Sequence, residues 1–282
     1  MYHAFLVLIG GALKIKDILT ILNRIAPFDL TEKWDNSGLQ AGNPEAEVDK
    51  IITGLDVTMA LLNEARERDA GLVLTHHPLM ISPEKTFDFN QMPGSAIREA
   101  AIHNISIVSV HTNLDKAENG LNDYFATRIG VEIKQAFLPH LPLSGDLSSE
   151  SGIGRLGRLE KKIRFKTFAK ETKDRLGLPN IRITGNPDNM VREIAVCTGS
   201  GGSLVRDFIG SGADVYVTGD VKYHEARQVE EASKNMIDVG HFGSEHMAVE
   251  LLSNRLNHVF EKNGVDLEVI PFLKEKDPFT IV

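Results

Sequence analysis

Short apolar runs alternate with amphipathic segments along the whole chain. Runs rich in β-branched residues occupy 50–56, 71–77 and 105–111, and their length and composition predict three strands. Apolar positions at helical spacing predict helices at about 59–70, 95–104 and 118–129. Thr58 precedes the first of these helices as an expected N-cap, and Gly130 follows the last as an expected stop.

The later part of the chain repeats this alternation. Strands are predicted at 192–199, 213–219 and 235–241, with helices at 203–212, at 224–234 and from Ser244 through Val259. Strands that alternate with helices favour mostly parallel sheets covered by helices. The sequence therefore predicts an α/β fold of two similar βαβαβα halves with layered α/β packing.

The two halves also align in their polar positions. "VLTHH" at 73–77 corresponds to "YVTGD" at 216–220, and "VHTNLD" at 110–115 corresponds to "GHFGSE" at 240–245. We interpret this as an internal duplication. Because ligands of open α/β sheets bind at the carboxyl ends of strands, we expect a site between the halves.

The predicted organisation has three parts. The first α/β half covers 1–135, of which the apolar residues 1–14 are a possible extension, and the second half covers 191–282. Residues 136–190 form a connecting region or small insert. Its start is rich in Gly, Ser and Pro and predicts loops, and a strand, a helix and a strand are expected after it.

Composition narrows the class of protein. The 282 residues carry a formal net charge of -8 and a single cysteine, Cys197. One cysteine permits neither an internal disulfide framework nor a cysteine-based zinc site, and it favours a reducing, cytoplasmic location. The acidic balance argues against a primary role on nucleic acid. The apolar start is too short to span a bilayer and lacks a basic leader, so no membrane function is expected.

Adjacent histidines, His76 and His77, end the second predicted strand. Neighbouring side chains in a strand point to opposite faces, and Pro78 ends the ladder at this point. The plain alternative is a strand end that happens to be polar. Two metal ions explain the pair better, because each imidazole could then bind a different ion.

Carboxylates occupy equivalent positions after the third strand of each half. Asp115 lies four residues after His111, and Glu245 lies four residues after His241. Taken alone, Asp115 could cap a helix and Glu245 could be a first-turn acid favoured by the helix dipole. Together with the histidines they form a ligand set suited to zinc, iron or manganese.

Further candidates have weaker signals. His111 could orient a ligand or carry protons, and His224 could be catalytic or simply solvated. The loop Gly199, Ser200, Gly201 and Gly202 could hold a phosphate, although a plain tight turn is the competing interpretation. Cys197 is expected to be a small core residue. "WDNSGLQAG" at 34–42 is either a well-packed loop or part of a pocket wall.

At these residues the sequence resembles the Nif-three-like family, often labelled GTP cyclohydrolase I type 2. The resemblance rests on "WDNSGLQAG", "LTHHPL", "VHTNLDKAENGLND", "GIGRLG", "GSGG", "TGDVKYHEA" and "DVGHFGSE", in this order, and indicates the short form without a large inserted domain. It implies that His76, His77, Asp115, His241 and Glu245 are the ligands of a dinuclear metal centre. It also implies a toroidal homohexamer, a trimer of dimers.

The leading functional hypothesis is a hydrolase with two divalent ions, Zn, Fe or Mn, per chain. Its substrate would be a small molecule such as a nucleotide, and the family label points to ring opening of GTP. One alternative is a metal-binding protein that delivers metal during cofactor assembly. Another is a regulatory binding partner without catalysis, for which the net charge of -8 argues against direct DNA binding.

Overall fold

The computed structural model describes residues 12–139 and 151–281. Most of the predicted extension at 1–14 and part of the loop region predicted after residue 136 lie outside the described residues. The chain forms two compact units. Unit 1 is Met1–Leu114 with Ala248–Glu275, and unit 2 is Asp115–Met247 with Lys276–Val282.

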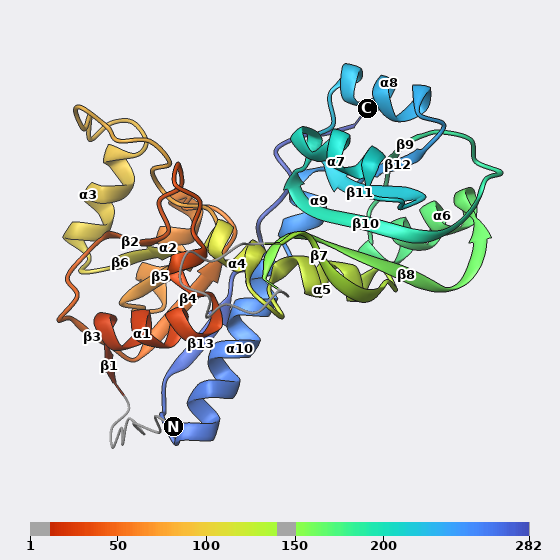
Figure 1. Cartoon of the computed structure of the whole chain (residues 1–282). Helices are drawn as coiled ribbons and strands as arrows, with labels where there is room; N and C mark the ends of the chain where they lie inside the picture. Colours follow the sequence, from red (N-terminus) through yellow and green to blue (C-terminus); the bar gives the residue numbers. More distant parts are fainter. Residues whose placement is uncertain (1–11, 140–150, 282) are drawn as a thin grey trace. The chain divides into compact units, whose positions relative to one another are not determined.

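Unit 1 is built on a five-stranded sheet with the order β13-β4-β5-β6-β2 (Figure 1). Its strands are β2 (Gly38–Ala41), β4 (Lys50–Gly54), β5 (Leu72–Thr75), β6 (Ser106–Ser109) and β13 (Glu268–Pro271). All neighbours pair in parallel except β2, which runs antiparallel to β6. β1 (Leu13–Lys14) and β3 (Glu47–Val48) pair with each other in a separate, two-stranded antiparallel sheet.

Helices cover both faces of the unit 1 sheet. Alternate strand residues, Ile52, Val73 and Ile107, pack in one core cluster with α2 (Met59–Glu67) and α3 (Gly94–Ile102). On the other face the Thr53 hydroxyl donates to the Val249 carbonyl of α10 (Ala248–Asn263), 3.1 Å away. The unit also contains α1 (Ile15–Ile25) and the 3₁₀ turn η1 (Phe28–Leu30).

Unit 2 has a mixed six-stranded sheet with the order β7-β8-β10-β11-β12-β9. The strands are β7 (Glu132–Pro139), β8 (Gly152–Arg164), β9 (Arg182–Thr184), β10 (Met190–Ser200), β11 (Val215–Gly219) and β12 (Asn235–Asp238). β10, β11 and β12 are parallel, and the three outer strands are antiparallel to their neighbours. The expectation of a mostly parallel sheet therefore holds for unit 1 and only for the centre of unit 2.

Helices cover both faces of the unit 2 sheet (Figure 1), and buried side chains form a separate core on each face. Val196, Val217 and Ile237 pack with α5 (Leu121–Arg128) and α6 (Phe165–Leu176) on one face. Residues of opposite parity, including Cys197 and Tyr216, pack with α7 (Val205–Gly210) and α8 (Tyr223–Glu231) on the other. Three short elements remain among the described residues: α4 (Thr112–Lys116), η2 (Gly202–Leu204) and α9 (His241–Glu245).

The structure confirms the predicted helix cap at Thr58 and contradicts the predicted helix from Ser244 to Val259. Thr58 is the N-cap of α2, and its side chain accepts a hydrogen bond from the Leu61 N–H, as predicted. The long helix predicted from Ser244 to Val259 is wrong, because α9 ends at Glu245 and α10 begins at Ala248. Ser244 lies inside α9, where its hydroxyl donates to the His241 carbonyl and accepts from the Gly199 N–H.

The segment 136–190 supplies sheet strands as well as a connection. It contributes β8, α6 and β9, and β8 pairs with both β7 and β10. In the part of the chain that the structure describes, we find no helix with the length and apolarity that crossing a bilayer requires.

Candidate metal centre

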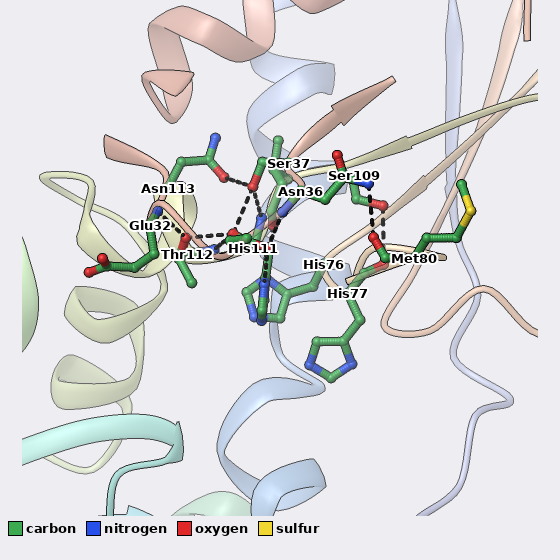
Figure 2. Close-up of polar contacts among 12 residues, drawn as sticks. Glu32, Asn36, Ser37, His76, His77, Met80, Ser109, His111, Thr112 and Asn113 are labelled. Carbon is green, nitrogen blue, oxygen red and sulfur yellow. Dashed lines mark hydrogen bonds and ion pairs between the residues drawn. The ribbon is translucent and has the colours of Figure 1, made fainter. Parts of the chain in front are cut away.

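Three histidines gather at the carboxyl edge of the unit 1 sheet. His76 and His77 follow β5, and His111 follows its parallel neighbour β6. Their ring centroids lie 5.0, 5.2 and 5.5 Å apart. One ligand nitrogen from each ring lies within 4.8 Å of the other two. Figure 2 shows the three imidazoles side by side below the backbone turns that carry them.

Each of these rings is held through Nδ1 by a hydrogen-bond acceptor. The acceptors are Val110 O for His76 at 2.9 Å, Asp56 Oδ1 for His77 at 2.7 Å and Asp35 Oδ1 for His111 at 2.8 Å. A carbonyl or carboxylate oxygen can only accept, so Nδ1 carries the proton in each ring. Nε2 is then the nitrogen able to bind a metal, as in most metal-ligating histidines.

Asp35 is the centre of a buried network in the loop 34–42. Its side chain is fully buried, and it accepts from the Thr112 N–H and from the hydroxyls of Thr112 and Ser37. Burial opposes ionisation, but the hydrogen bonds from His111 and Thr112 outweigh it and hold the pKa of Asp35 well below its ordinary value. The Trp34 ring meets His111 edge-on. The loop is therefore part of the wall around this histidine.

Asp56 was not singled out from the sequence, although a signal was present. It follows β4, the strand beside β5, and so reaches the same sheet edge as His77. The N–H groups of Leu55 and Asp56 both donate to the Glu275 carboxylate. This contact fixes the backbone that carries Asp56, and hence the carboxylate that orients His77.

The turn through the adjacent histidines is also fixed. The His77 carbonyl accepts from the hydroxyl of Thr75 at 2.7 Å and from that of Ser109 at 3.1 Å. The rings of His76 and His77 are tilted by 41° to one another. Two imidazoles at such a turn can therefore present their Nε2 atoms in different directions.

Unit 2 carries a second group, of carboxylates and one histidine. The Asp115 carboxylate accepts from the Thr198 hydroxyl at 3.1 Å. The side chain of buried Asn122 forms hydrogen bonds with the backbones of the same two residues. Its amide donates to the Asp115 carbonyl at 3.1 Å, and its oxygen accepts from the Thr198 N–H at 2.9 Å.

His241 lies between two carboxylates of unit 2. Its Nδ1 is 2.8 Å from Asp220 Oδ2, and its Nε2 is 2.8 Å from Glu245 Oε2, one helical turn later in α9. Glu245 is buried, and one of its oxygens lies within 4.8 Å of an Asp115 oxygen. Two carboxylates this close repel each other unless a positive charge compensates them.

The glycine-rich loop packs tightly against this group. Gly199 has a φ of +63°, and a Cβ there would lie 2.2 Å from Glu245 Oε1. The N–H groups of Gly199 and Gly201 donate to the hydroxyls of Ser244 and Thr218. These two donors are thus engaged inside the fold, which favours the tight turn over a phosphate cradle.

The remaining candidates lie apart from these groups. His224 is exposed on α8, where its ring contacts that of Tyr223, and it belongs to none of the histidine–carboxylate groups found among residues 12–139 and 151–281. Cys197 is buried in β10, and burial raises the pKa of its thiol to about 12, which suits a core residue and not a nucleophile. His246 stacks on Phe242.

The donor chemistry fits a transition metal in both units. Unit 1 offers imidazoles whose Nδ1 protons are already committed, and unit 2 offers an imidazole with buried carboxylates. Imidazole and carboxylate together suit zinc, iron or manganese better than calcium or magnesium, which prefer oxygen ligands alone.

A family model named Duf34/NIF3 (NGG1p interacting factor 3) matches residues 13–278. The chain belongs to the Duf34/NIF3 family. A Clostridium perfringens relative named "GTP cyclohydrolase 1 type 2 homolog" is 34% identical over 96% of this chain and 100% of its own length. A relative of the same name from Clostridium acetobutylicum is 32% identical over 95% of this chain and 98% of its own length.

Solved structures share the fold of this chain. A Staphylococcus aureus hypothetical protein, SA1388, matches with a TM-score of 0.88 and 27% identity, over 95% of this chain and 99% of that chain. Reduced HcgD from Methanocaldococcus jannaschii matches with a TM-score of 0.75 and 27% identity, over 92% of this chain and 97% of that chain. The family prediction made from the sequence motifs is thus confirmed.

Proposed function

We propose that this Duf34/NIF3 protein is a hydrolase that depends on two divalent metal ions. His76, His77, Asp115, His241 and Glu245 would hold them, and zinc, iron or manganese suits this ligand set. The observation that carries the proposal is the Nδ1 hydrogen bond of each of the three ligand histidines. An Nδ1–H that donates to a fixed acceptor leaves Nε2 unprotonated and free to bind a metal. A histidine that serves only packing does not need this arrangement.

Two such ions would supply a nucleophile by lowering the pKa of a shared water toward neutrality. The chain's own residues have separate tasks. Asp56 and Asp220 keep the imidazoles of His77 and His241 in one tautomer and one orientation. Thr198 holds one oxygen of Asp115 by a hydrogen bond. His111, whose ring lies beside those of His76 and His77, or His224 would carry protons to or from the substrate.

The proposed substrate is a nucleotide, and GTP is the first to test. The support comes from the relatives, two of which, from Helicobacter pylori, carry the name "GTP cyclohydrolase 1 type 2". Both C–N bonds at C8 of the guanine would be hydrolysed. The five-membered ring would open, and C8 would leave as formate. The N–H groups of Gly199 and Gly201 already donate to the hydroxyls of Ser244 and Thr218. In the 199–202 loop, only Ser200 and Gly202 would therefore contact a phosphate.

Three further expectations belong to the same proposal: the internal duplication, the hexamer and the cytoplasmic location. The matching β10-β11-β12 and β4-β5-β6 orders, each parallel, support the internal duplication. The toroidal hexamer and the cytoplasmic location rest on the resemblance and on the single cysteine. Sedimentation of the full chain would test the hexamer, since a trimer of dimers has six times the mass of the monomer.

Elemental analysis of the untagged protein, purified without chelator, is the first test. We expect about two metal ions per chain, and a sharp loss in the Asp115→Ala variant. His103→Ala is the matched control, because His103 is exposed at the end of α3. A positive result leads to a turnover screen that begins with GTP and measures released formate, alongside other nucleotides and phosphoesters.

Each negative result contradicts a different part of the proposal. Near-zero metal after incubation with zinc, iron and manganese would exclude the dinuclear centre. Two metal ions that exchange readily, with no turnover on the panel, would exclude the hydrolase and favour a role in metal delivery.

A further inference from the structure

The ends of β10, β11 and β12 meet at the carboxyl edge of the unit 2 sheet, and each end has a glycine: Gly199, Gly219 and Gly240. A Cβ at Gly219 would lie 2.7 Å from the Gly240 carbonyl and 2.8 Å from the Gly199 oxygen, so the backbones approach too closely for a side chain there. The turn after β11 carries Asp220, and the turn after β12 carries His241. Their side chains meet at 2.8 Å, so this pair depends on how the two turns are held.

The Asp238 carboxylate, at the end of β12, is hydrogen-bonded to both of these turns. Its Oδ1 accepts from the Gly240 N–H at 2.9 Å, and its Oδ2 accepts from the Val221 N–H at 3.2 Å. Gly240 directly precedes His241 in the chain, and Asp238 itself is buried. Val221 directly follows Asp220. A single buried carboxylate therefore connects the two turns that carry the Asp220–His241 pair.

The backbone of both turns needs such support. Asp220 has a φ of 53° and Gly240 a φ of 78°, in the left-handed region that residues other than glycine adopt less readily. Conformations of this kind cost free energy and persist where surrounding contacts hold them. The two hydrogen bonds to Asp238 are contacts of this kind, because each lies one residue from a partner of the pair.

Arg182 places a positive charge against the same carboxylate. It lies on the edge strand β9, opposite Asp238 of β12 (Figure 1). Its guanidinium donates to Asp238 Oδ2 and, at 3.0 Å, to the Val221 carbonyl. The Arg182 side chain is largely exposed, whereas that of Asp238 is buried. A buried carboxylate is stable only when it is paired and hydrogen-bonded, and β9 supplies this partner from the segment 136–190.

We propose that Asp238, held by Arg182, is a positioning residue for His241. It acts only through the Asp220–His241 pair: the two turns bring Asp220 Oδ2 to His241 Nδ1, which leaves Nε2 to bind a metal. This inference rests on the proposed function in taking His241 as a metal ligand. It goes beyond that function by naming the residues that hold this ligand in place, and it does not depend on turnover.

Two variants of the full-length chain test the inference, with Zn²⁺ as the probe. Asp238→Asn keeps one acceptor oxygen and replaces the other with an amide group that cannot accept an N–H. Arg182→Met removes the guanidinium at an exposed position. The relevant Zn²⁺ is the one whose binding is lost in a His241→Ala chain. Competition with a chromophoric chelator should show that each variant binds it about 10-fold more weakly, the lower end of the effect of an outer partner.

A spectroscopic signal separates positioning from a general loss of structure. In the zinc-loaded chain with ¹⁵N-labelled histidine, the His241 Nδ1–H should give a slowly exchanging NMR signal, because it donates to Asp220. The signal is assigned by its absence from the His241→Ala chain. Both variants should broaden or lose it, because the acceptor is no longer held beside the ring.

Matched controls come from another Arg–Asp pair of unit 2. Arg164 and Asp188 form an exposed ion pair of 2.9 Å. Arg164 lies opposite Met190 at the start of β10, the end of the strand away from Gly199. Arg164→Met and Asp188→Asn should therefore leave both the Zn²⁺ affinity and the NMR signal unchanged. Circular dichroism of every variant checks that the fold is retained.

Two results would overturn the inference. One is that the folded variants bind Zn²⁺ as tightly as the controls; the other is a loss of affinity with an unchanged His241 signal. If Asp238→Asn does not fold, Arg182→Met decides, because its side chain is exposed.

The outcomes for the proposed function are distinct. If the wild-type chain binds two metal ions and the variants match the controls, the proposed function stands without this inference. If the variants lose affinity and signal but no substrate is hydrolysed, the inference stands and the proposed hydrolase fails. A wild-type chain that binds no Zn²⁺ would contradict both.

Discussion

Replacing Asn122 with alanine should destabilise unit 2 and loosen Asp115. Asn122 is fully buried and makes two hydrogen bonds, to the Asp115 carbonyl and from the Thr198 N–H. Alanine removes the side-chain partner of the buried Thr198 N–H and of the partly buried Asp115 carbonyl. A buried group left unsatisfied costs about 1–3 kcal/mol, so we expect the free energy of unfolding to fall by about 1–3 kcal/mol.

Urea denaturation followed by circular dichroism measures this change. The chain has two compact units, which can unfold in separate transitions, so hydrogen exchange should locate the effect. Amides of β10 in unit 2 should exchange faster in the variant, whereas those of β4 in unit 1 serve as the internal reference. Asn90→Ala, at an exposed position, is the matched control.

The Thr198→Val variant separates stability from metal binding. Valine keeps the shape of threonine and both Asn122 bonds, and it removes only the hydroxyl that donates to Asp115. We expect a small loss of stability with a 10–100-fold loss of metal affinity, the typical effect of an outer partner. The reasoning would be refuted if the free energy of unfolding of Asn122→Ala lay within about 1 kcal/mol of that of Asn90→Ala, because this is about the precision of such measurements.

Other variants test separate contacts. Arg155→Met removes a buried guanidinium that binds Asp123 and three backbone carbonyls, and it should cost about 3–5 kcal/mol in urea denaturation, whereas exposed Arg158→Met should cost less than about 1 kcal/mol. Gly199→Ala places a methyl group against Glu245, so elemental analysis should show less bound metal in a chain that is also less stable. Because the pKa of the Cys197 thiol is about 12 in the folded chain against 9.0 as its ordinary value, the unfolded chain ionises first as pH rises. Above pH 9 the free energy of unfolding should then fall by about 1.4 kcal/mol per pH unit relative to a C197A variant. If urea denaturation showed the same pH dependence for both chains, the raised pKa of a buried thiol would be contradicted.

The strand and helix pattern was largely readable from the sequence, because periodicity reports which face of an element is buried. The strands at 50–56, 71–77 and 105–111 became β4, β5 and β6, and the Thr58 cap was found where it was predicted. Periodicity does not report which strand lies beside which. The antiparallel outer strands of unit 2, and the pairing of β13 with β4 after more than 200 intervening residues, therefore needed the structure.

The sequence also did not predict the break between α9 and α10. The sequence predicted one helix because Ser244 was expected to open it and apolar residues follow at helical spacing: Ala248, Leu251, Leu252 and Leu256. The hydroxyl of Ser244 accepts from the Gly199 N–H, and that partner is 45 residues away in the sequence. A local pattern cannot show a hydrogen bond to a distant strand.

By itself the sequence determined the family and the position of each histidine and carboxylate relative to a strand end. The order of short motifs is specific, and side chains at the carboxyl ends of neighbouring parallel strands must meet at one sheet edge. Only the tertiary structure decided how those side chains are held. Asp35 reaches His111 across 76 residues, and Asp56 reaches His77 across 21. Their tautomers depend on these contacts, because an imidazole commits its Nδ1 proton only when an acceptor lies within hydrogen-bond distance.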